Sequence, residues 1–593
     1  TLEEGAAAAV VDGSGYVLSL HTAPGTVEVP EGGRLIFASN YEKKLELLRF
    51  AEPGQRVIFD EDAGKLYLYG SADYAADVCA EKYADLAARI AAAKQALTAL
   101  DYAAIDAELE EAEALLAAGE GYDALLRAAV LLDGLEYKLV PSFAVQDRAA
   151  WVAFPGRTAA DVRKTAAYAE SLGLNTLIVS PFESGYALYD TCLPHLEKHP
   201  ELAEDTDILQ CYVDECRARG IRLYFMYCCF GTQEPSDAYS ADHYVNFFAD
   251  KLLLNKQGGS VATYYEDSSY SLNPFDAEVR AWTKDLLAEV AARYDVDGIQ
   301  LDYIRFPLPN SWGDNYNDHG YNEDMILAFM EQAQTGVSPK DMRTTDPLWE
   351  SWCAFRRDVI TSFVREVSEL LRDTNLIFSC TCFADYNDRQ MYVYQDVEKW
   401  AGEGLIDELY PMIYAATAEE HIERADEIAA GIGESCRLVL GLGTYDGQTP
   451  AIVSEQAVYN RTAGGNGNSI FALPYTQVFG FDRLYAEGLY RTPAVHTDDC
   501  GAAMPAFLTE LCETIDSTYL YLCPDCGAER IREKIAAAAD ELAGLGGAAD
   551  DESRLAYWQQ AAQTMRSLRE ALDEAGVEAR VQADLLDRMA YIE

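Results

Sequence analysis

Tyr294-Asp-Val-Asp-Gly-Ile-Gln-Leu-Asp-Tyr-Ile-Arg-Phe-Pro307 is the stretch that decides the fold of this chain. It follows a long helix-like run and predicts a short strand over 296–302 that opens into a loop. Ile299 and Leu301 would face surrounding helices and Asp302 the opposite side, because side chains alternate along a strand. A carboxylate at a strand end is typical of the catalytic end of an α/β enzyme. An Asp that only caps a loop is the simpler alternative, and the rest of the chain decides between them.

Strand-like segments alternate with amphipathic helix-like segments from Arg148 onwards. The predicted strands are Trp151–Phe154, Thr176–Pro181, Arg222–Tyr227, Val296–Asp302, Leu376–Phe383, Glu408–Tyr414, Leu438–Tyr445 and Ser469–Tyr475. Eight strand–helix units over about 350 residues predict an α/β fold, the closed (β/α)8 TIM barrel. The alternative, a doubly wound sheet, requires a Gly-rich phosphate-binding turn after the first strand, which Trp151-Val-Ala-Phe-Pro-Gly156 does not supply.

The composition changes on either side of this alternating region. We predict a small accessory β domain over 1–75, a helical hairpin or bundle over 76–146, the catalytic barrel over 147–495 and a C-terminal helical domain over 496–593. The helical flanks have Leu and Ala at helical spacing. They are expected to pack as spacers, and they also offer surface for an oligomer or a protein contact.

The charge of the chain excludes some classes of partner. Its 593 residues include 46 Lys and Arg against 99 Asp and Glu, a formal net charge of −53. Such a charge repels nucleic acids and anionic membrane surfaces. No apolar run reaches the roughly 20 residues of a transmembrane helix. The first residue is Thr1 and not Met, so we expect that an export signal has been removed and that the protein is extracellular or at the cell surface; a cytoplasmic location is the alternative.

The metal and cofactor signals are weak. Most of the fourteen cysteines lie in predicted strands and helices, where buried thiols are expected. Cys523-Pro-Asp-Cys526 lies near Cys500, Cys512 and His496, but the spacing is irregular for a structural zinc site. The chain has only seven His, and neither a Gly-x-Ser-x-Gly elbow nor a P-loop occurs. We therefore expect no metal and no cofactor.

In a barrel the residues that end the strands share one pocket. The candidate catalytic residues there are the carboxylates Asp302, Glu183, Asp385 and Asp446. The candidate substrate-binding residues are Arg305, Tyr303, Tyr227, Trp312, Tyr414, Tyr445 and Tyr475. Carboxylates among aromatic rings predict glycoside hydrolysis of a carbohydrate, in which one carboxyl group protonates the leaving oxygen and another attacks or activates water.

Each carboxylate can be given a role. Asp302 is predicted to be the nucleophile or base, because Arg305 close by favours the ionised form. The proton donor is then Glu183 or Asp385, with a slight preference for Glu183, and Asp446 would stabilise the cationic transition state.

Three further acids stand at strand beginnings. Asp297, Asp407 and Glu408 therefore belong to the opposite end of the barrel, where residues support stability.

Several motifs resemble those of one known family. They are Leu272-Asn-Pro274, Glu278-Val-Arg280, Tyr294–Pro307, Trp352, Phe355-Arg356, Gln395-Asp396, Trp400, and Asp407 with Tyr410-Pro-Met-Ile-Tyr414. Over roughly Arg148–Pro493 the chain resembles the glycosyl-hydrolase-like family 10. The resemblance implies a TIM barrel that acts on polysaccharide outside the cell, with the family's strand-4 Asp at Asp302 and its Arg at Arg305.

Two pocket segments depart from the family pattern. Phe225-Met-Tyr-Cys-Cys-Phe230 replaces a His-Ala-Trp-type end of strand 3, and Phe182-Glu183 stands where an Arg is usual. We therefore expect a substrate that differs from the family's. The alternative function is a non-catalytic, carbohydrate-binding barrel that serves as a surface adhesin or scaffold.

Overall fold

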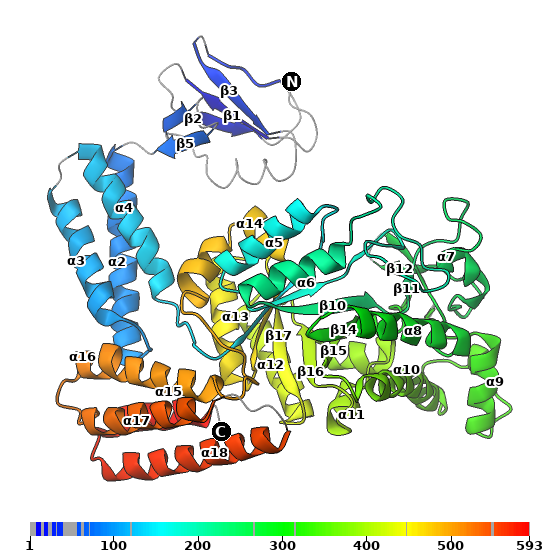
Figure 1. Ribbon diagram of the computed structural model, residues 1–593. Coiled ribbons are helices and arrows are strands. Elements are labelled where there is room, and N and C mark those ends of the chain that lie inside the picture. Colours follow the sequence, from blue (N-terminus) through cyan, green and yellow to red (C-terminus); the bar gives the residue numbers. More distant parts are fainter. Residues whose placement is uncertain are drawn as a thin grey trace.

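A closed barrel, two groups of helices and an N-terminal β segment make up the computed structural model (Figure 1). The structure describes residues 7–12, 17–21, 26–30, 32–38, 56–60, 65–69, 72–118, 121–264, 267–312, 316–445, 447–546 and 551–591. The predicted fold class, a (β/α)8 TIM barrel with small N-terminal strands and helical flanks, is confirmed.

Eight parallel strands close the barrel. In chain order they are β6 (Asp147–Val152), β7 (Thr176–Val179), β10 (Arg222–Cys228), β14 (Gly298–Asp302), β15 (Ile377–Phe383), β16 (Glu408–Met412), β17 (Arg437–Gly443) and β18 (Gly467–Phe471). Each pairs with the next, and β18 pairs with β6. The main helices around them are α5 (Ala159–Ser171), α6 (Ile208–Arg219), α8 (Ala277–Arg293), α10 (Trp349–Leu371), α11 (Val397–Gly402), α12 (Ala418–Ile432), α13 (Pro450–Thr462) and α14 (Leu473–Val478).

Two strand boundaries differ clearly from the prediction. The first strand begins at Asp147, four residues before the predicted start, because its polar residues find buried partners at the bottom of the barrel. The last strand ends at Phe471, and Tyr475 lies in α14. Pro474 occupies the first turn of that helix, where its missing N–H has no cost, so the apolar run continues as helix.

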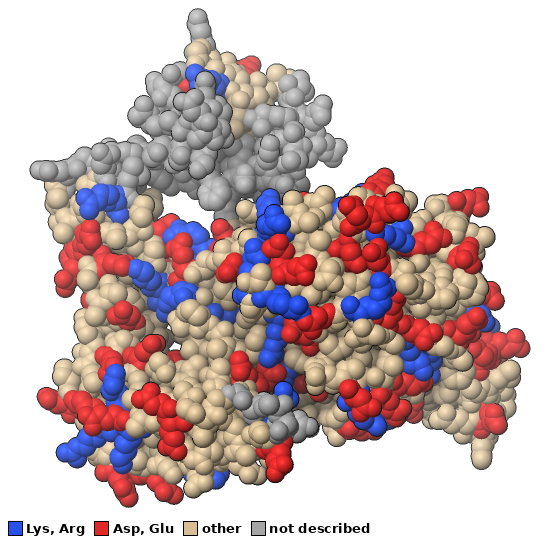
Figure 2. All heavy atoms as spheres, in the orientation of Figure 1, with Lys and Arg blue, Asp and Glu red and all other residues tan. Residues whose placement is uncertain are grey.

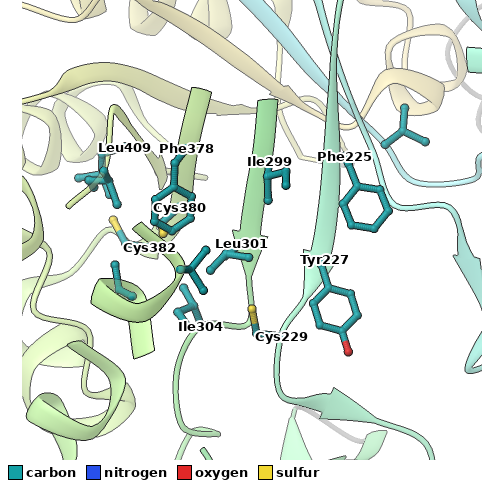
Figure 3. Packing of buried hydrophobic residues seen from close by; sticks show 14 of the residues in the cluster. Phe225, Tyr227, Cys229, Ile299, Leu301, Ile304, Phe378, Cys380, Cys382 and Leu409 are labelled. Carbon is teal, nitrogen blue, oxygen red and sulfur yellow. The ribbon is translucent and has the colours of Figure 1, made fainter. Parts of the chain in front are cut away.

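The two faces of β14 have separate neighbours. Ile299 and Leu301 pack with side chains of β10, β15 and β16 between barrel and helices (Figure 3). On the inner face, the Gln300 side chain accepts a hydrogen bond from Trp151 Nε1 at 2.7 Å. A Cβ at Gly298 would lie 2.8 Å from the carbonyl oxygen of Ile377, so this position requires glycine. The predicted alternation of this strand is therefore present.

The N-terminal ends of the strands are held by acids. Asp297 Oδ2 accepts from the Leu223 N–H, and Asp407 Oδ2 from the Phe378 N–H, both at 2.8 Å. Glu408 is buried and accepts from Tyr410 Oη at 2.9 Å. These three acids lie at the structural end, as their positions at the start of strands indicate.

Short strands form the described part of the N-terminal segment. They are β1 (Ala7–Val11), β2 (Val17–His21) and β3 (Arg34–Ala38) in one antiparallel sheet, and β4 (Arg56–Asp60) with β5 (Lys65–Tyr69) in a hairpin. β1 contains three alanines, which are weak strand formers, and it pairs with both β2 and β3.

The helical flanks have hydrophobic cores of their own. The first group is α2 (Ala72–Ala96), α3 (Tyr102–Ala118) and α4 (Gly121–Lys138). The second includes α15 (Ala503–Thr514), α16 (Leu520–Leu522), α17 (Glu529–Leu545), α18 (Asp551–Glu574) and α19 (Ala579–Ala590). The two clusters are in contact, since Leu97 packs into the second and Leu522 into the first. The division into four domains stays a prediction.

Within the described ranges, no helix is long and apolar enough to cross a membrane. All fourteen cysteines are free thiols. Among the residues that the structure describes, no group of three or more His, Cys, Asp or Glu side chains is arranged to hold a metal ion.

Candidate active site

Asp302 ends β14 with its side chain at the mouth of the barrel, where the predicted site lies. Its Oδ1 accepts hydrogen bonds from Thr381 Oγ1 and from the Tyr303 N–H, both at 2.6 Å, and a longer contact of 3.4 Å from Arg305. No described residue donates to Oδ2. The carboxylate is therefore oriented through one of its oxygens.

Tyr303 has an unusual backbone conformation. Its φ of 50° lies in the left-handed region, which costs a residue with a side chain on the order of 1–3 kcal/mol. This turn lets its N–H reach the carboxylate that precedes it. The Arg305 guanidinium lies between two rings, 4.2 Å from the centre of the Tyr303 ring and 4.8 Å from that of Phe383. These contacts hold Asp302, Tyr303 and Arg305 together in one turn.

A cavity of about 450 Å³ adjoins this turn. Its walls come from the loops after β7, β10 and β14, and most of its lining is aromatic or small and polar. The lining includes Phe182, Glu183, Ser184, Tyr227, Cys228, Tyr244, Tyr270, Tyr303, Arg305 and Phe383. Four predicted site residues therefore meet in one cavity: Glu183, Tyr227, Tyr303 and Arg305. Its size suits a small organic ligand.

Glu183 forms an ion pair with an arginine. Arg157 donates to both of its oxygens, from Nε at 2.8 Å and from the terminal nitrogen at 2.6 Å, and also pairs with Glu201. The hydrogen bond from Arg157 lowers the pKa of Glu183. An acid held in its ionised form is a poor proton donor, so the slight preference for Glu183 in that role has no support from its environment.

Tyr227 and Cys228 are packed into the cavity wall. The Tyr227 ring lies 5.5 Å from that of Phe182 and is almost fully buried. Burial raises the pKa of the Cys228 thiol, and the negative charge of Asp302 adds to this effect. Cys228 therefore stays protonated and is not a nucleophile.

A second group of aromatic rings lies on the other side of the mouth. Tyr414 stacks on Phe471 at 4.9 Å, with Trp151 and Tyr445 edge-on to it. Tyr475, from α14, contacts Phe471 at 6.2 Å. The predicted aromatic residues of the last three strands therefore meet in one cluster over the barrel axis, separate from the cavity.

The loops after β14 and β15 hold the other predicted residues. Trp312 is half exposed and lies against Tyr392, with ring centres 4.5 Å apart. Asp385 follows β15, and its Oδ1 accepts from the Asp388 N–H at 3.0 Å. Asp446 lies outside the described residues.

Two residues that the sequence reasoning missed belong to this region. Thr381 is one, and its inward position on β15 is the signal that could have identified it. Asp388 is the other. Burial raises its pKa, and the negative charge of Asp385 adds to this effect. The signal that could have identified Asp388 is its position three residues after Asp385, in a loop predicted to lie at the mouth.

The model of the family described as glycosyl hydrolase-like 10 matches residues 144–460. The chain belongs to this family. The match confirms the resemblance seen in the sequence motifs, and it includes the first seven barrel strands with Asp302, Arg305 and Thr381. The molecule is therefore a glycoside hydrolase-like barrel. No curated protein sequence matches the chain.

Solved glycoside hydrolase barrels resemble the glycosyl hydrolase-like 10 chain only distantly. The PgaB (BpsB) glycoside hydrolase domain from Bordetella bronchiseptica is 12% identical over 58% of this chain and 99% of its own, with a TM-score of 0.43. The catalytic domain of β-amylase from Paenibacillus polymyxa is 10% identical over 57% and 95%, with a TM-score of 0.41. α-L-Fucosidase isoenzyme 2 from Paenibacillus thiaminolyticus is 12% identical over 58% and 48%, with a TM-score of 0.39.

Proposed function

We propose that this protein hydrolyses glycosidic bonds in a polysaccharide or oligosaccharide, with Asp302 as the nucleophile or base. The orientation of Asp302 carries the proposal. Its carboxylate lies at the functional end of a glycoside hydrolase-like barrel, and three donors hold one of its oxygens. The hydroxyl of Thr381, the backbone N–H of Tyr303 and the guanidinium of Arg305 hold the carboxylate in one orientation, as a nucleophile or base requires.

The proton donor is proposed to be Asp388, with Asp385 as its partner. A general acid must keep its proton near neutral pH, so a raised pKa suits it. The pKa of Asp388 is raised by burial and by the charge of Asp385, whereas that of Glu183 is lowered by Arg157. Glu183, which lines the cavity, is instead proposed to accept hydrogen bonds from substrate hydroxyl groups.

The substrate is proposed to be an uncharged glycan outside the cell. Acidic side chains are spread over the barrel and the C-terminal helices on the face shown in Figure 2, and they disfavour polyanions. The cavity has aromatic rings together with Ser and Gln side chains, which suit the faces and hydroxyl groups of sugars. The location outside the cell is proposed from the family resemblance.

A second candidate function is glycan binding without cleavage. It is favoured by the ion pair of Glu183 with Arg157, because Glu183 is the only carboxylate among the described residues that line the cavity. A barrel that lacks a proton donor near Asp302 would act as an adhesin or scaffold.

One experiment separates the two functions. The purified protein and its Asp302→Asn variant are incubated with a panel of uncharged polysaccharides, and new reducing ends are measured. Release by the wild type that is lost in Asp302→Asn supports hydrolysis. Binding of a glycan without any release supports the binding function, and equal release by both proteins contradicts the role of Asp302.

A further inference from the structure

Exposed aromatic side chains are concentrated at one end of the barrel. Six aromatic residues among those described have more than a third of their surface exposed. Five lie on segments that follow barrel strands: Phe154, Phe247, Tyr303, Trp312 and Tyr386. The sixth, Tyr521, lies in the C-terminal helices. Single exposed rings need no explanation, but five at the functional end of one barrel indicate a ligand surface.

The exposed rings stand on opposite sides of the mouth. Phe154, 69% exposed, follows the first strand, β6, and Tyr386, 47% exposed, follows the fifth, β15. Trp312, 52% exposed, follows the fourth, β14, which ends with Asp302. In a closed barrel of eight strands the first and fifth are opposite each other. The segments that carry Phe154 and Tyr386 therefore leave the barrel on opposite sides of the mouth, and Asp302 ends the strand next to β15.

The exposed rings differ in how much of their surface other side chains of the protein cover. Phe247 stacks on His195 at 3.6 Å, almost parallel, so one of its faces is covered within the protein. Trp312 and Tyr392 are nearly perpendicular at 4.5 Å, a contact that orients Trp312 and leaves half of it exposed. Arg389 lies 5.6 Å from the centre of the Tyr386 ring, and Tyr316 lies 6.2 Å from that of Trp312, yet about half of each ring stays exposed, against 38% for Phe247. We assign ligand stacking to the three most exposed rings, Phe154, Trp312 and Tyr386, and not to Phe247.

We propose that the barrel mouth binds a glycan chain of several sugar units, with stacking subsites at Phe154 on one side and at Trp312 and Tyr386 on the other. The proposal rests on the proposed function and extends it to cleavage within a chain. The apolar face of a sugar ring packs on an aromatic face and needs no charge. The net charge of −53 repels a polyanion, and the occupant that we propose is an uncharged chain.

Affinity electrophoresis with the Asp302→Asn variant tests the subsites without any turnover. The protein is run through gels that contain one of a panel of uncharged polysaccharides, and oligosaccharides of increasing length compete for the bound polymer. We expect retardation by at least one polysaccharide and competition that strengthens with oligosaccharide length. Phe154→Ala, Trp312→Ala and Tyr386→Ala, each added to Asp302→Asn, should raise the dissociation constant for the polysaccharide by about three- to tenfold.

Tyr521→Ala is the matched control, because it removes an exposed ring far from the mouth along the chain and should leave the retardation unchanged. Retardation by none of the uncharged polysaccharides, or by polyanions alone, overturns the proposal. So does retardation that the three mouth substitutions leave unchanged, or competition that does not increase beyond a monosaccharide.

The wild-type reaction distinguishes failure of the subsites from failure of hydrolysis. Cleavage within a chain lowers the viscosity of the polymer while few reducing ends have appeared. Reducing ends that accumulate without this early fall overturn the subsite proposal and support hydrolysis. Retardation that depends on Phe154 and Trp312 but produces no reducing ends supports the subsites and contradicts hydrolysis.

Discussion

Thr381 and Asp302, on neighbouring strands of the barrel, are joined by a hydrogen bond of 2.6 Å from the hydroxyl group to carboxylate Oδ1. The two residues are 79 positions apart, and both point toward the mouth. An ionised carboxylate can only accept, so the hydroxyl hydrogen is committed to Asp302. The orientation of the Asp302 carboxylate therefore depends on a residue of the adjacent strand.

Thr381→Val should reduce kcat by about ten- to a hundredfold, because a hydrogen bond to a charged group contributes about 1.5–3 kcal/mol. KM should change little, since Thr381 is proposed to position Asp302 and not to bind substrate. Thr381→Ser keeps the hydroxyl group and should restore most of the activity. Equal losses of kcat in both variants would contradict the positioning role.

Asp302→Asn should lower the release of reducing ends by about 10²–10⁴-fold, the usual contribution of a base or nucleophile. Asp297→Asn is the matched control, at the residue that precedes the same strand. Its carboxylate accepts from the Leu223 N–H at the other end of the barrel. It should lower the free energy of unfolding by about 1 kcal/mol while the activity of the folded fraction is kept.

Asp388→Asn should abolish hydrolysis of natural glycans but spare aryl glycosides with good leaving groups, because these depart without a proton. In the wild type, activity should fall as pH rises through the raised pKa of Asp388, since the acid is then ionised. Glu183→Gln should not produce this leaving-group dependence. If it does, Glu183 is the proton donor despite its pairing with Arg157.

Asp147 should make the fold sensitive to acid. Burial alone would raise its pKa, but the hydrogen bond and charge of His496, the charge of Arg437 and the hydrogen bond from Thr497 outweigh burial and lower the pKa. Its contribution to stability is therefore complete above the unfolded value of about 3.9 and is lost as pH falls through the lower folded value. In Asp147→Asn, the unfolding free energy should depend less on pH below about 4, as urea titrations at several pH values can measure.

The Arg356–Asp318 ion pair should be a major anchor of the long loop after β14. Both side chains are completely buried, and Tyr321 and Tyr394 each donate to Asp318 at 2.8 Å. Asp318→Asn leaves the guanidinium without a counter-charge and should cost about 3–5 kcal/mol of unfolding free energy in urea.

An exposed ion pair provides the comparison for that loss. Arg365 and Glu403 pair at 2.6 Å with both side chains 41% exposed. Arg365→Met should change stability by no more than about 1 kcal/mol, because water screens such pairs. A similar small effect of Asp318→Asn would contradict the anchoring role.

The fold and the strand-4 site could be predicted because their signals are local. Ile299, Leu301 and Asp302 alternate within one strand, and Arg305 follows three residues later. The prediction of a strand at Tyr475 is wrong, because an apolar run of a few residues is compatible with both strand and helix. Pro474, in the first turn of α14, favours the helix.

The amino-acid sequence by itself determined the eight strand–helix units, the end of the barrel to which Asp297, Asp302, Asp407 and Glu408 belong, and the family. Only the tertiary structure decided which groups surround those acids. Arg157 meets Glu183 across 26 residues, Thr381 meets Asp302 across 79, and His496 meets Asp147 across 349. The periodicity of the sequence predicts which side chains share a face of one helix or strand. These partners lie on different elements and come together only when the barrel closes and its loops pack. The chemistry of a carboxylate depends on such neighbours, and so its role follows from the closed barrel.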